Sequence, residues 1–406
     1  MNKNVWATRT ALAAAATAIL AGALPAAAAT ASTPATAPLP PLQILTDQAG
    51  TGGGDLFVAP SSATSQYSSG VEILSQNGRK VVWSKKVPAG QEAADFREQT
   101  YQGKPVLTWW QGTGLGGLST GVDYIYNDRY QKIATVKAGD GDSADGHEFL
   151  ITPWNTALIV SYKQTTADLT GIGGPADQQV IDGIVQEIDI RTGKVLFSWN
   201  SADHVPYSQS EQPLPASAST PWDWFHLNAV KLDTDGNLLL DARDTWTSYE
   251  VSRRSGRILW QLGGKASSFK LTAAPGQVLD SAGDIFAWQH DPQPLGNGLY
   301  TFFDNESAGQ GNTGSGAVSE LPYSRVVTVR LNARAHTAEL VRSVDQPEGQ
   351  IASSQGNGQT LGDGDLVVGW GSLPYVSEFS RSGALLFNAE FPTGVNTYRA
   401  YRFPWK

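Results

Sequence analysis

One pattern recurs along most of this chain: a run of alternating apolar residues, a turn that contains glycine, and a second alternating run that ends in aromatic residues. It occurs at residues 71–85 (VEILSQNGRKVVWSK), 185–199, 248–262 and 376–391. A second kind of hairpin precedes most of these, at residues 147–163, 226–243, 290–304 and 354–371. Alternation with a period of two, interrupted by glycine turns, is typical of antiparallel β-hairpins. Each pair of hairpins therefore predicts one four-stranded unit.

The number and spacing of these units predict how they assemble. Residues 105–137 form a further unit, and another lies near residues 43–87 and is closed by the C-terminal segment TYRAYRFPW, which brings the number to six. Four-stranded repeats of roughly 50 to 80 residues are typical of β-propellers. The chain has 43 glycines and 22 prolines, and only 17% of its residues are charged, which favours short strands and turns over helical bundles. We predict an all-β fold: a six-bladed β-propeller of four-stranded antiparallel blades over residues 43–406.

The N-terminus has the features of an export signal. Lys3 and Arg9 precede a segment rich in alanine and leucine, and small residues suited to cleavage follow near residues 27–30. We predict a signal peptide over residues 1–30, followed by a Pro/Ala/Thr linker over residues 31–42. The apolar run is about 15 residues long, whereas a membrane span needs about 20. The protein is therefore expected to be secreted, with no membrane span after cleavage of the signal.

The charge of the chain limits its partners. The formal net charge is −9, and it becomes −11 once the two cations of the signal are removed. This balance argues against nucleic acid or an acidic membrane surface as a partner. Any anion that the protein binds must be held by a local site. The chain has no cysteine, so no disulfide can stabilise it.

Three of the five histidines occupy equivalent positions. His147, His226 and His290 each open an inner hairpin, in three successive units. The innermost strands of a propeller all run the same way along the central axis, so equivalent positions meet at one end of the channel. We therefore expect these three imidazoles to converge. His204 and His336 lie outside the pattern and are predicted to lie in loops or outer strands.

The hairpin at residues 226–243 adds two more candidates. If its turn is centred between residues 234 and 235, His226 faces Arg243 and Asn228 faces Asp241. Residues two apart on a strand share a face, so His226, Asn228 and Arg243 are predicted to project together. A bulge at Gly236 would shift this register by one residue.

Two kinds of site are compatible with these residues. Three histidines could hold a metal ion. Arg243 argues against a metal, because its permanent positive charge would repel a divalent ion; with histidine and amide donors it builds a pocket for a tetrahedral oxyanion. We predict no metal and no cofactor.

At this point the segments GHEFLITPWNTALI, WFHLNAVKLDTDGNLLLDAR, ILWQLGGKASSF and WQHDPQPLGNGLYTFFDN carry a resemblance. Over most of residues 100–391 the chain resembles the arylsulfotransferase family, and it looks closer to the actinobacterial and fungal branch. The resemblance implies a six-bladed propeller, no nucleotide donor, and ping-pong transfer of a sulfuryl group from a phenolic sulfate to a phenolic acceptor. It also implies that His290 is the transiently sulfated nucleophile, that His226, Asn228 and Arg243 hold the sulfuryl oxygens, and that His147 is a further residue of the site.

The remaining candidates would contact the substrate. Ser354 opens the next unit at the equivalent position and could offer a hydroxyl. Trp222, Trp224, Trp246 and Trp288 flank the motifs, where they either stack on a phenol or pack between blades. Two alternatives stay open at this point: a metal-dependent hydrolase or lyase that uses the three histidines, and a propeller that binds carbohydrate or protein without catalysis. The donor, the acceptor and the oligomeric state are left open too.

Overall fold

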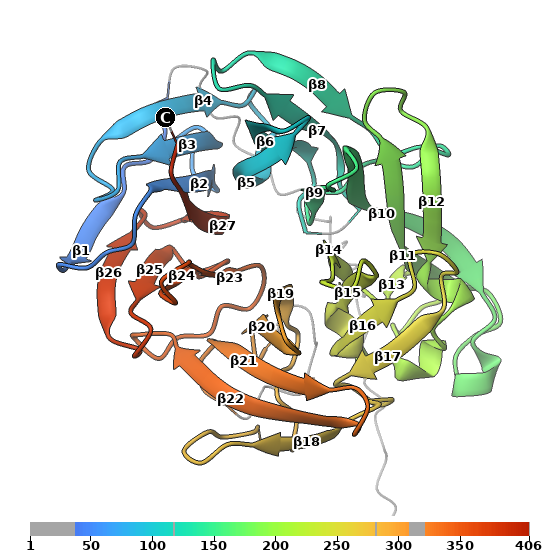
Figure 1. Cartoon of the computed structure of the whole chain (residues 1–406). Helices are drawn as coiled ribbons and strands as arrows, with labels where there is room; N and C mark the ends of the chain where they lie inside the picture. Colours follow the sequence, from blue (N-terminus) through green and yellow to red (C-terminus); the bar gives the residue numbers. More distant parts are fainter. Residues whose placement is uncertain (1–36, 117, 281, 308–320, 406) are drawn as a thin grey trace, which may run out of the picture. The chain divides into compact units, whose positions relative to one another are not determined.

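Six antiparallel sheets follow one another around a ring in the computed structural model (Figure 1). The structure describes residues 37–116, 118–280, 282–307 and 321–405. The predicted signal peptide, residues 1–30, lies outside the described residues, as does the predicted linker up to residue 36. The predicted all-β class and the six-bladed propeller are confirmed. None of the helices in the described ranges has the length and apolar character that crossing a bilayer requires.

The first three blades, each given from the axis outward, have the following strands. The first blade contains β27 (Val395–Phe403), β2 (Asp55–Ser62), β3 (Gly70–Leu74) and β4 (Val81–Lys86). The second contains β5 (Glu92–Tyr101), β6 (Lys104–Thr113), β7 (Thr120–Tyr126) and β8 (Lys132–Val136). The third contains β9 (Phe149–Ile151), β10 (Thr156–Ala167), β11 (Gln178–Asp189) and β12 (Val195–Asn200), with the short β13 (Trp222–Asp223) parallel to β11.

The other three blades follow the same order. The fourth contains β14 (Leu227–Leu232), β15 (Leu238–Ala242), β16 (Thr247–Val251) and β17 (Ile258–Leu262). The fifth contains β19 (His290–Gly296), β20 (Leu299–Asp304), β21 (Arg325–Asn332) and β22 (Thr337–Asp345), with β18 (Lys270–Ala273) parallel to β22. The sixth contains β23 (Asn357–Thr360), β24 (Leu366–Gly369), β25 (Tyr375–Phe379), β26 (Leu385–Glu390) and β1 (Gln43–Asp47). Four short 3-10 helices lie in the connections of the described chain: η1 (Thr170–Ile172), η2 (Ser201–Asp203), η3 (Tyr207–Gln209) and η4 (Arg243–Thr245).

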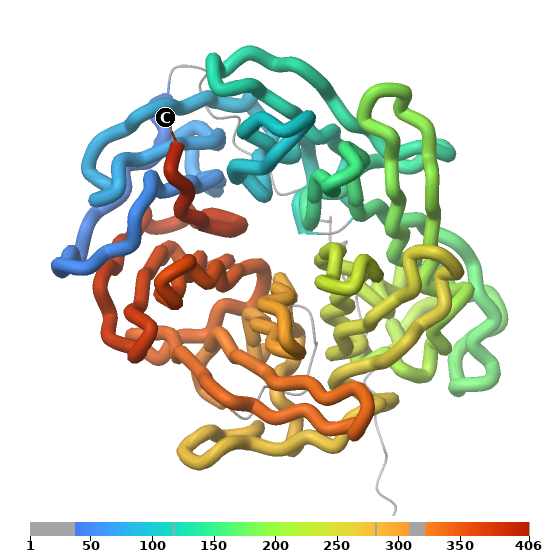
Figure 2. The backbone as a smooth tube through the Cα atoms, in the orientation of Figure 1, coloured from blue at the N-terminus to red at the C-terminus, as the bar shows by residue number. Residues whose placement is uncertain are grey.

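The ring is closed by strands from both ends of the chain. The C-terminal β27 pairs with β2 and forms the inner strand of the first blade, as the sequence predicted. Figure 2 shows this red segment beside the blue one. The prediction that residues 43–47 belong to the same blade is wrong, because β1 pairs with β26 of the sixth blade. In that place β1 covers an edge of β26 whose backbone groups would otherwise have no strand partner.

Apolar cores fill the space between neighbouring blades. Between the third and fourth blades, Trp199, Trp224, Phe225 and Tyr249 are all buried in one cluster. The ring centroids of Phe225 and Tyr249 lie 5.6 Å apart. Large aromatic side chains bury more apolar area than other residues, so these contacts hold adjacent blades together.

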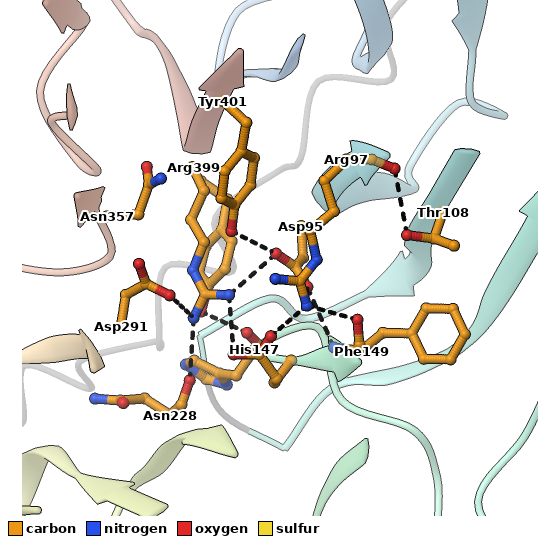
Figure 3. A network of polar contacts seen from close by, with 12 residues as sticks. Asp95, Arg97, Thr108, His147, Phe149, Asn228, Asp291, Asn357, Arg399 and Tyr401 are labelled. Atoms are coloured by element: carbon orange, nitrogen blue, oxygen red, sulfur yellow. Dashed lines mark hydrogen bonds and ion pairs between the residues drawn. The ribbon is translucent and has the colours of Figure 1, made fainter. Parts of the chain in front are cut away.

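A buried network of charges joins the inner strands (Figure 3). Arg399 of β27 lies 3.0 Å from Asp95 of β5 and 3.0 Å from Glu148, which precedes β9. Lys231 of β14 lies 2.6 Å from Glu148 and 2.8 Å from Asp291 of β19. Five of the six blades therefore contribute a charged side chain to one cluster.

Two carboxylates of this network stand on bulges. Asp95 lies where the register between β5 and β6 shifts, and Asp291 lies where the register between β19 and β20 shifts. Their φ angles are 52° and 50°, in the left-handed region that residues other than glycine seldom adopt. Because a bulge re-aims a side chain, these irregular positions direct the two carboxylates into the network.

Replacing Arg399 with methionine is expected to destabilise the protein by about 3–5 kcal/mol, because Asp95, Glu148 and Asp291 would lose a buried partner. Equilibrium unfolding in urea measures this. Arg79→Met is the matched control, since the Arg79–Asp47 pair is exposed and should contribute less than about 1 kcal/mol. Equal effects of the two substitutions would contradict a structural role for the network.

Candidate active site

The hairpin of β14 and β15 brings His226 and Arg243 together. The backbone N–H of Arg243 donates to the carbonyl of His226 at 3.0 Å, so the predicted pairing of these two residues is confirmed. The predicted pairing of Asn228 with Asp241 is wrong, because Ala229 stands opposite Asp241. Gly236, at φ 86°, makes the turn one residue longer than predicted, and a bulge at Asn228 restores the register before His226.

His147 and His226 come from adjacent blades and face each other. Their ring centroids lie 5.1 Å apart with the planes nearly perpendicular, and both side chains are buried. Nδ1 of His147 contacts a carboxylate oxygen of Asp145, and Nδ1 of His226 lies 2.5 Å from Oδ2 of Asp223. Each carboxylate therefore fixes the orientation of one ring and leaves its Nε2 directed elsewhere.

His290, the first residue of β19, is held by Asn305. Nδ1 of His290 lies 2.6 Å from Oδ1 of Asn305. The amide nitrogen of Asn305 donates to the carbonyls of Ala352 and Gln355, at 2.7 and 3.0 Å, so its oxygen must face the imidazole. An amide oxygen only accepts, which places the proton of neutral His290 on Nδ1 and the lone pair on Nε2. The backbone N–H of Gln355 donates to this Nε2 at 3.2 Å.

Asn305 was not predicted from the sequence, although a signal was present. It follows β20 just as Arg243 follows β15, and it terminates a strand paired with the strand that His290 opens. The signal is this equivalent position after the strand, because strand pairing alone places Phe303 opposite His290.

Arg243 connects the fourth blade to the sixth. It is buried, and it lies 2.9 Å from a carboxylate oxygen of Asp244 and 3.1 Å from the carbonyl of Ser353. Its Nε is buried without a hydrogen-bond partner. Ser354 lies between Ser353, which accepts from Arg243, and Gln355, which donates to His290. The chain around Ser354 therefore touches two of the predicted site residues.

Asn228 is fully buried beside the same hairpin. Its side-chain amide donates to the carbonyl of Gln289 at 2.7 Å, and its Oδ1 has no partner. This contact holds the residue that precedes His290. In the observed geometry Asn228 therefore helps to position the strand that carries His290.

The imidazoles of His290 and His226 have opposite protonation tendencies. Burial, and then the positive charge of Arg243, lower the pKa of His290 well below its usual value. Burial also lowers the pKa of His226, but Asp223 and Asp244 outweigh it, and the net shift is upward. The site therefore holds a neutral imidazole together with one that favours its charged form.

Several residues in or beside this group have a strained backbone. His226, Trp246, Trp288 and Gln355 have φ angles of 51°, 49°, 51° and 64°. Each such conformation costs about 1–3 kcal/mol for a residue with a side chain, and it persists only where the surroundings enforce it. The left-handed positions direct side chains that a regular strand would place elsewhere.

The tryptophans near the motifs fall into two groups. Trp224 is fully buried in the core between blades, where its Nε1 donates to Asp182 at 3.1 Å, and Trp222 is buried in the same cluster. These two agree with the packing alternative. Trp246 and Trp288 instead contact each other edge to face, with ring centroids 4.4 Å apart, three residues after Arg243 and two before His290. Nε1 of Trp246 is buried without a partner.

The other two histidines lie away from this group, as predicted. His204 lies in a loop and stacks on Trp199, with ring centroids 4.9 Å apart. His336 is exposed in the turn between β21 and β22.

The arrangement suits an anion better than a divalent metal. Within the described ranges, two groups bring three candidate ligand atoms within 4.8 Å of one another: Asp223–His226–Asp244 and Asp233–Asp235–Glu250. His147, His226 and His290 do not form such a group in that part of the chain. Asp244 of the first group is already paired with Arg243, whose fixed positive charge would repel a metal ion bound there.

At pH 6 to 7, nitrogen-15 spectroscopy of labelled protein is expected to show His290 neutral with its proton on Nδ1, and His226 protonated to a greater extent than a free histidine. Asn305→Leu removes the acceptor and should abolish the preference for Nδ1–H at His290 while leaving His226 unchanged. A protonated His290 in the native protein at this pH would contradict the assignment.

Comparison with known proteins adds the following. The sequence model of the arylsulfotransferase (ASST) family matches residues 97–392. No curated protein matches. Similar solved structures include a Bacteroides caccae protein of unknown function, with 12% identity, 86% of this chain and 98% of that chain covered, and a TM-score of 0.49.

Two further structures are similar at lower scores. The WD40 domain of Pan2 from Neurospora crassa has 10% identity, covers 88% of this chain and 81% of its own, and gives a TM-score of 0.42. A catalytically inactive virginiamycin B lyase from Staphylococcus aureus has 9% identity, covers 86% and 88%, and gives 0.39. The family match spans well over half of the sequence and includes His147, His226, Arg243 and His290, so this chain belongs to the arylsulfotransferase family.

Proposed function

We propose that the protein moves a sulfuryl group from a phenolic sulfate ester to a phenolic acceptor through a sulfated His290, without a nucleotide donor. One observation carries this proposal: the contact with Asn305 leaves the lone pair of a neutral, buried imidazole on Nε2. A histidine held in this state is a nucleophile without needing a separate base, once the sulfuryl group displaces the 3.2 Å contact from the backbone N–H of Gln355.

In the first half-reaction, Nε2 of His290 attacks the sulfur and the bond from sulfur to the phenolic oxygen breaks. The bonding electron pair leaves with the phenolate, which takes a proton from His226. The raised pKa of His226 suits it to this task, because it favours the protonated form before transfer. The product is a phenol and an imidazole that carries the sulfuryl group on Nε2.

The sulfuryl oxygens need donors throughout the reaction. Arg243 has a buried Nε with no partner, and His147 lies beside His226. A charge-assisted hydrogen bond contributes roughly 1.5–3 kcal/mol. If such bonds are stronger to the transition state than to the ester, they lower the barrier.

The second half-reaction reverses the first with a different phenol. The now neutral His226 removes the acceptor's proton, and the phenolic oxygen attacks sulfur. The bond from sulfur to Nε2 breaks, and its electron pair returns to His290. The enzyme is thus restored with His226 protonated.

Trp246 and Trp288 would bind the aryl ring. They flank Arg243 and His290 in sequence, and Trp246 is partly exposed while Trp288 is buried, so the pair extends inward from the surface. Ser354 would offer its hydroxyl to the substrate. Trp224, predicted from the sequence for the same role, is committed to the core by its contact with Asp182.

The proposal includes export. Residues 1–30 would direct secretion, residues 31–42 would act as a linker, and residues 43–406 would form the catalytic domain. A propeller that binds ligand without catalysis would be favoured if His226 and Arg243 pointed away from the channel. Both are buried, and His226 faces His147.

Intact mass spectrometry of protein mixed with an aryl sulfate, without an acceptor, is expected to show one added sulfuryl group. His290→Ala should abolish the adduct, because the accepting nitrogen is gone. His336→Ala is the control, since this histidine is exposed on an outer turn. An adduct that persists in His290→Ala would remove the mechanism.

The pH dependence of kcat/KM should follow the two imidazoles. The nucleophile must be deprotonated, so activity falls at low pH only well below about 6.5, the unperturbed value. The acid must be protonated, so activity is lost on the alkaline side above that value. Asp223→Asn removes the charge that raises the pKa of His226 and should move the alkaline limb to lower pH. An unchanged alkaline limb would show that another group is the acid.

A further inference from the structure

A cavity lies at the opposite end of the inner strands from the histidines. Its volume is about 680 Å³, within the range of small-molecule sites. Its walls come from five blades and include Gln102, Ile151, Gln293, Gln359 and Phe403. The wall residues on β9, β19 and β23 lie further along the strand than the site residues at the strand starts, so the cavity is separate from the proposed catalytic site.

Two buried polar atoms of the wall residues lack a partner. Nε of Arg97 and Oε2 of Glu98 are both buried without a hydrogen bond. Arg97 is 7% exposed. Buried polar atoms nearly always have partners, so a donor and an acceptor left open beside a cavity point to a ligand that supplies both.

Other polar groups of the wall are already engaged. The amide nitrogen of Gln99 donates to Thr108 and to the carbonyl of Phe149, and its oxygen accepts from Ile151. Gln359 exchanges two hydrogen bonds with the backbone of Arg402. These amides shape the wall, and Arg97 and Glu98 are left to recognise the ligand.

The charges of the cavity favour a neutral ligand. Arg97 lies 3.1 Å from Asp95 and 2.5 Å from Glu148, so its charge is already balanced. Burial raises the pKa of Glu98, which shows that its surroundings disfavour the carboxylate. An anion would meet no spare positive charge, and a cation would meet a carboxyl group whose charged form burial disfavours.

The wall also has an apolar and aromatic part. Leu150, Ile151 and Pro153 form part of it, together with Tyr401 and Phe403, whose ring centroids lie 5.8 Å apart. A ligand that fits needs an apolar face for these residues and hydroxyl groups that both donate and accept for Arg97 and Glu98. Sugars combine these properties.

We propose that this cavity binds a neutral carbohydrate. The oxygen of one hydroxyl accepts from the guanidinium of Arg97, and a second hydroxyl donates to the carboxyl group of Glu98, while the C–H face of the ring lies against the partly exposed Leu150 and Phe403. The proposal does not depend on sulfuryl transfer, because it uses none of the histidines.

Isothermal titration of the full chain with the neutral trisaccharides maltotriose, cellotriose and chitotriose tests this. At least one should bind in the millimolar range or tighter. Thr100→Trp places a large ring at the exposed cavity wall and should abolish binding, and Glu98→Leu should weaken it at least about 10-fold by removing the acceptor. Thr120→Trp, an exposed threonine of the same blade at the far end, is the matched control and should bind normally.

Three outcomes would overturn the proposal. The first is that none of the three sugars binds at millimolar concentrations. The second is binding that Thr100→Trp leaves unchanged, which would place the sugar elsewhere. The third is preferential binding of a uronic acid trimer, which would show that the cavity selects anions. Sulfuryl adduct formation by the same variants reports separately on the proposed enzyme activity and on correct folding.

Discussion

The balance of charge between the inner strands is the constraint on which the rest of this structure depends. Three cations, Arg97, Lys231 and Arg399, are buried with three anions, Asp95, Glu148 and Asp291. Removing such groups from water is costly, so the cluster is tolerable only because every charge has a partner within a few ångströms. Nearby Asp123 has no such partner: burial, then the charge of Asp95, raise the pKa of Asp123 well above its usual value and favour its neutral form. These pairs can form only if the inner strands of five blades keep their positions relative to one another along the axis of the propeller.

The positions of the site histidines depend on that network. Glu148 directly follows His147, and Asp291 directly follows His290, so one peptide unit carries a network carboxylate and a site imidazole. The guanidinium of Arg399 also approaches the carbonyl of Asn228, at 3.5 Å, within the bulge that restores the register before His226. The bulges reconcile two demands that regular strands cannot meet, since they direct consecutive side chains to the network and to the site.

Much of this could be predicted from the sequence because it depends on local alternation. The paired hairpins follow from period-two patterns, and the meeting of His147 with His226 follows from equivalent positions in repeated units. The place of β1 could not be predicted, because short strands at either end of the chain satisfy the same pattern in two blades. The bulge at Asn228 could not either, since it compensates for a turn whose length depends on Gly236. The charged network joins residues as far apart in the chain as Arg399 and Asp95, and no local pattern reports such a contact.

The different partners of two identical side chains would let one site supply both the nucleophile and the acid of the proposed reaction. His290 meets a neutral amide, which fixes the proton on Nδ1 without favouring a second proton, whereas His226 meets a carboxylate, which favours the charged ring. Arg243 reinforces the difference because its charge acts on both rings, and only His226 has carboxylates to offset it. An arriving sulfate ester would bring a negative charge close to His226 and favour its protonated form further, while His290 has no carboxylate among its hydrogen-bond partners. In the proposed reaction, the choice between asparagine and aspartate beside each ring would thus set the two chemical roles before any substrate is bound.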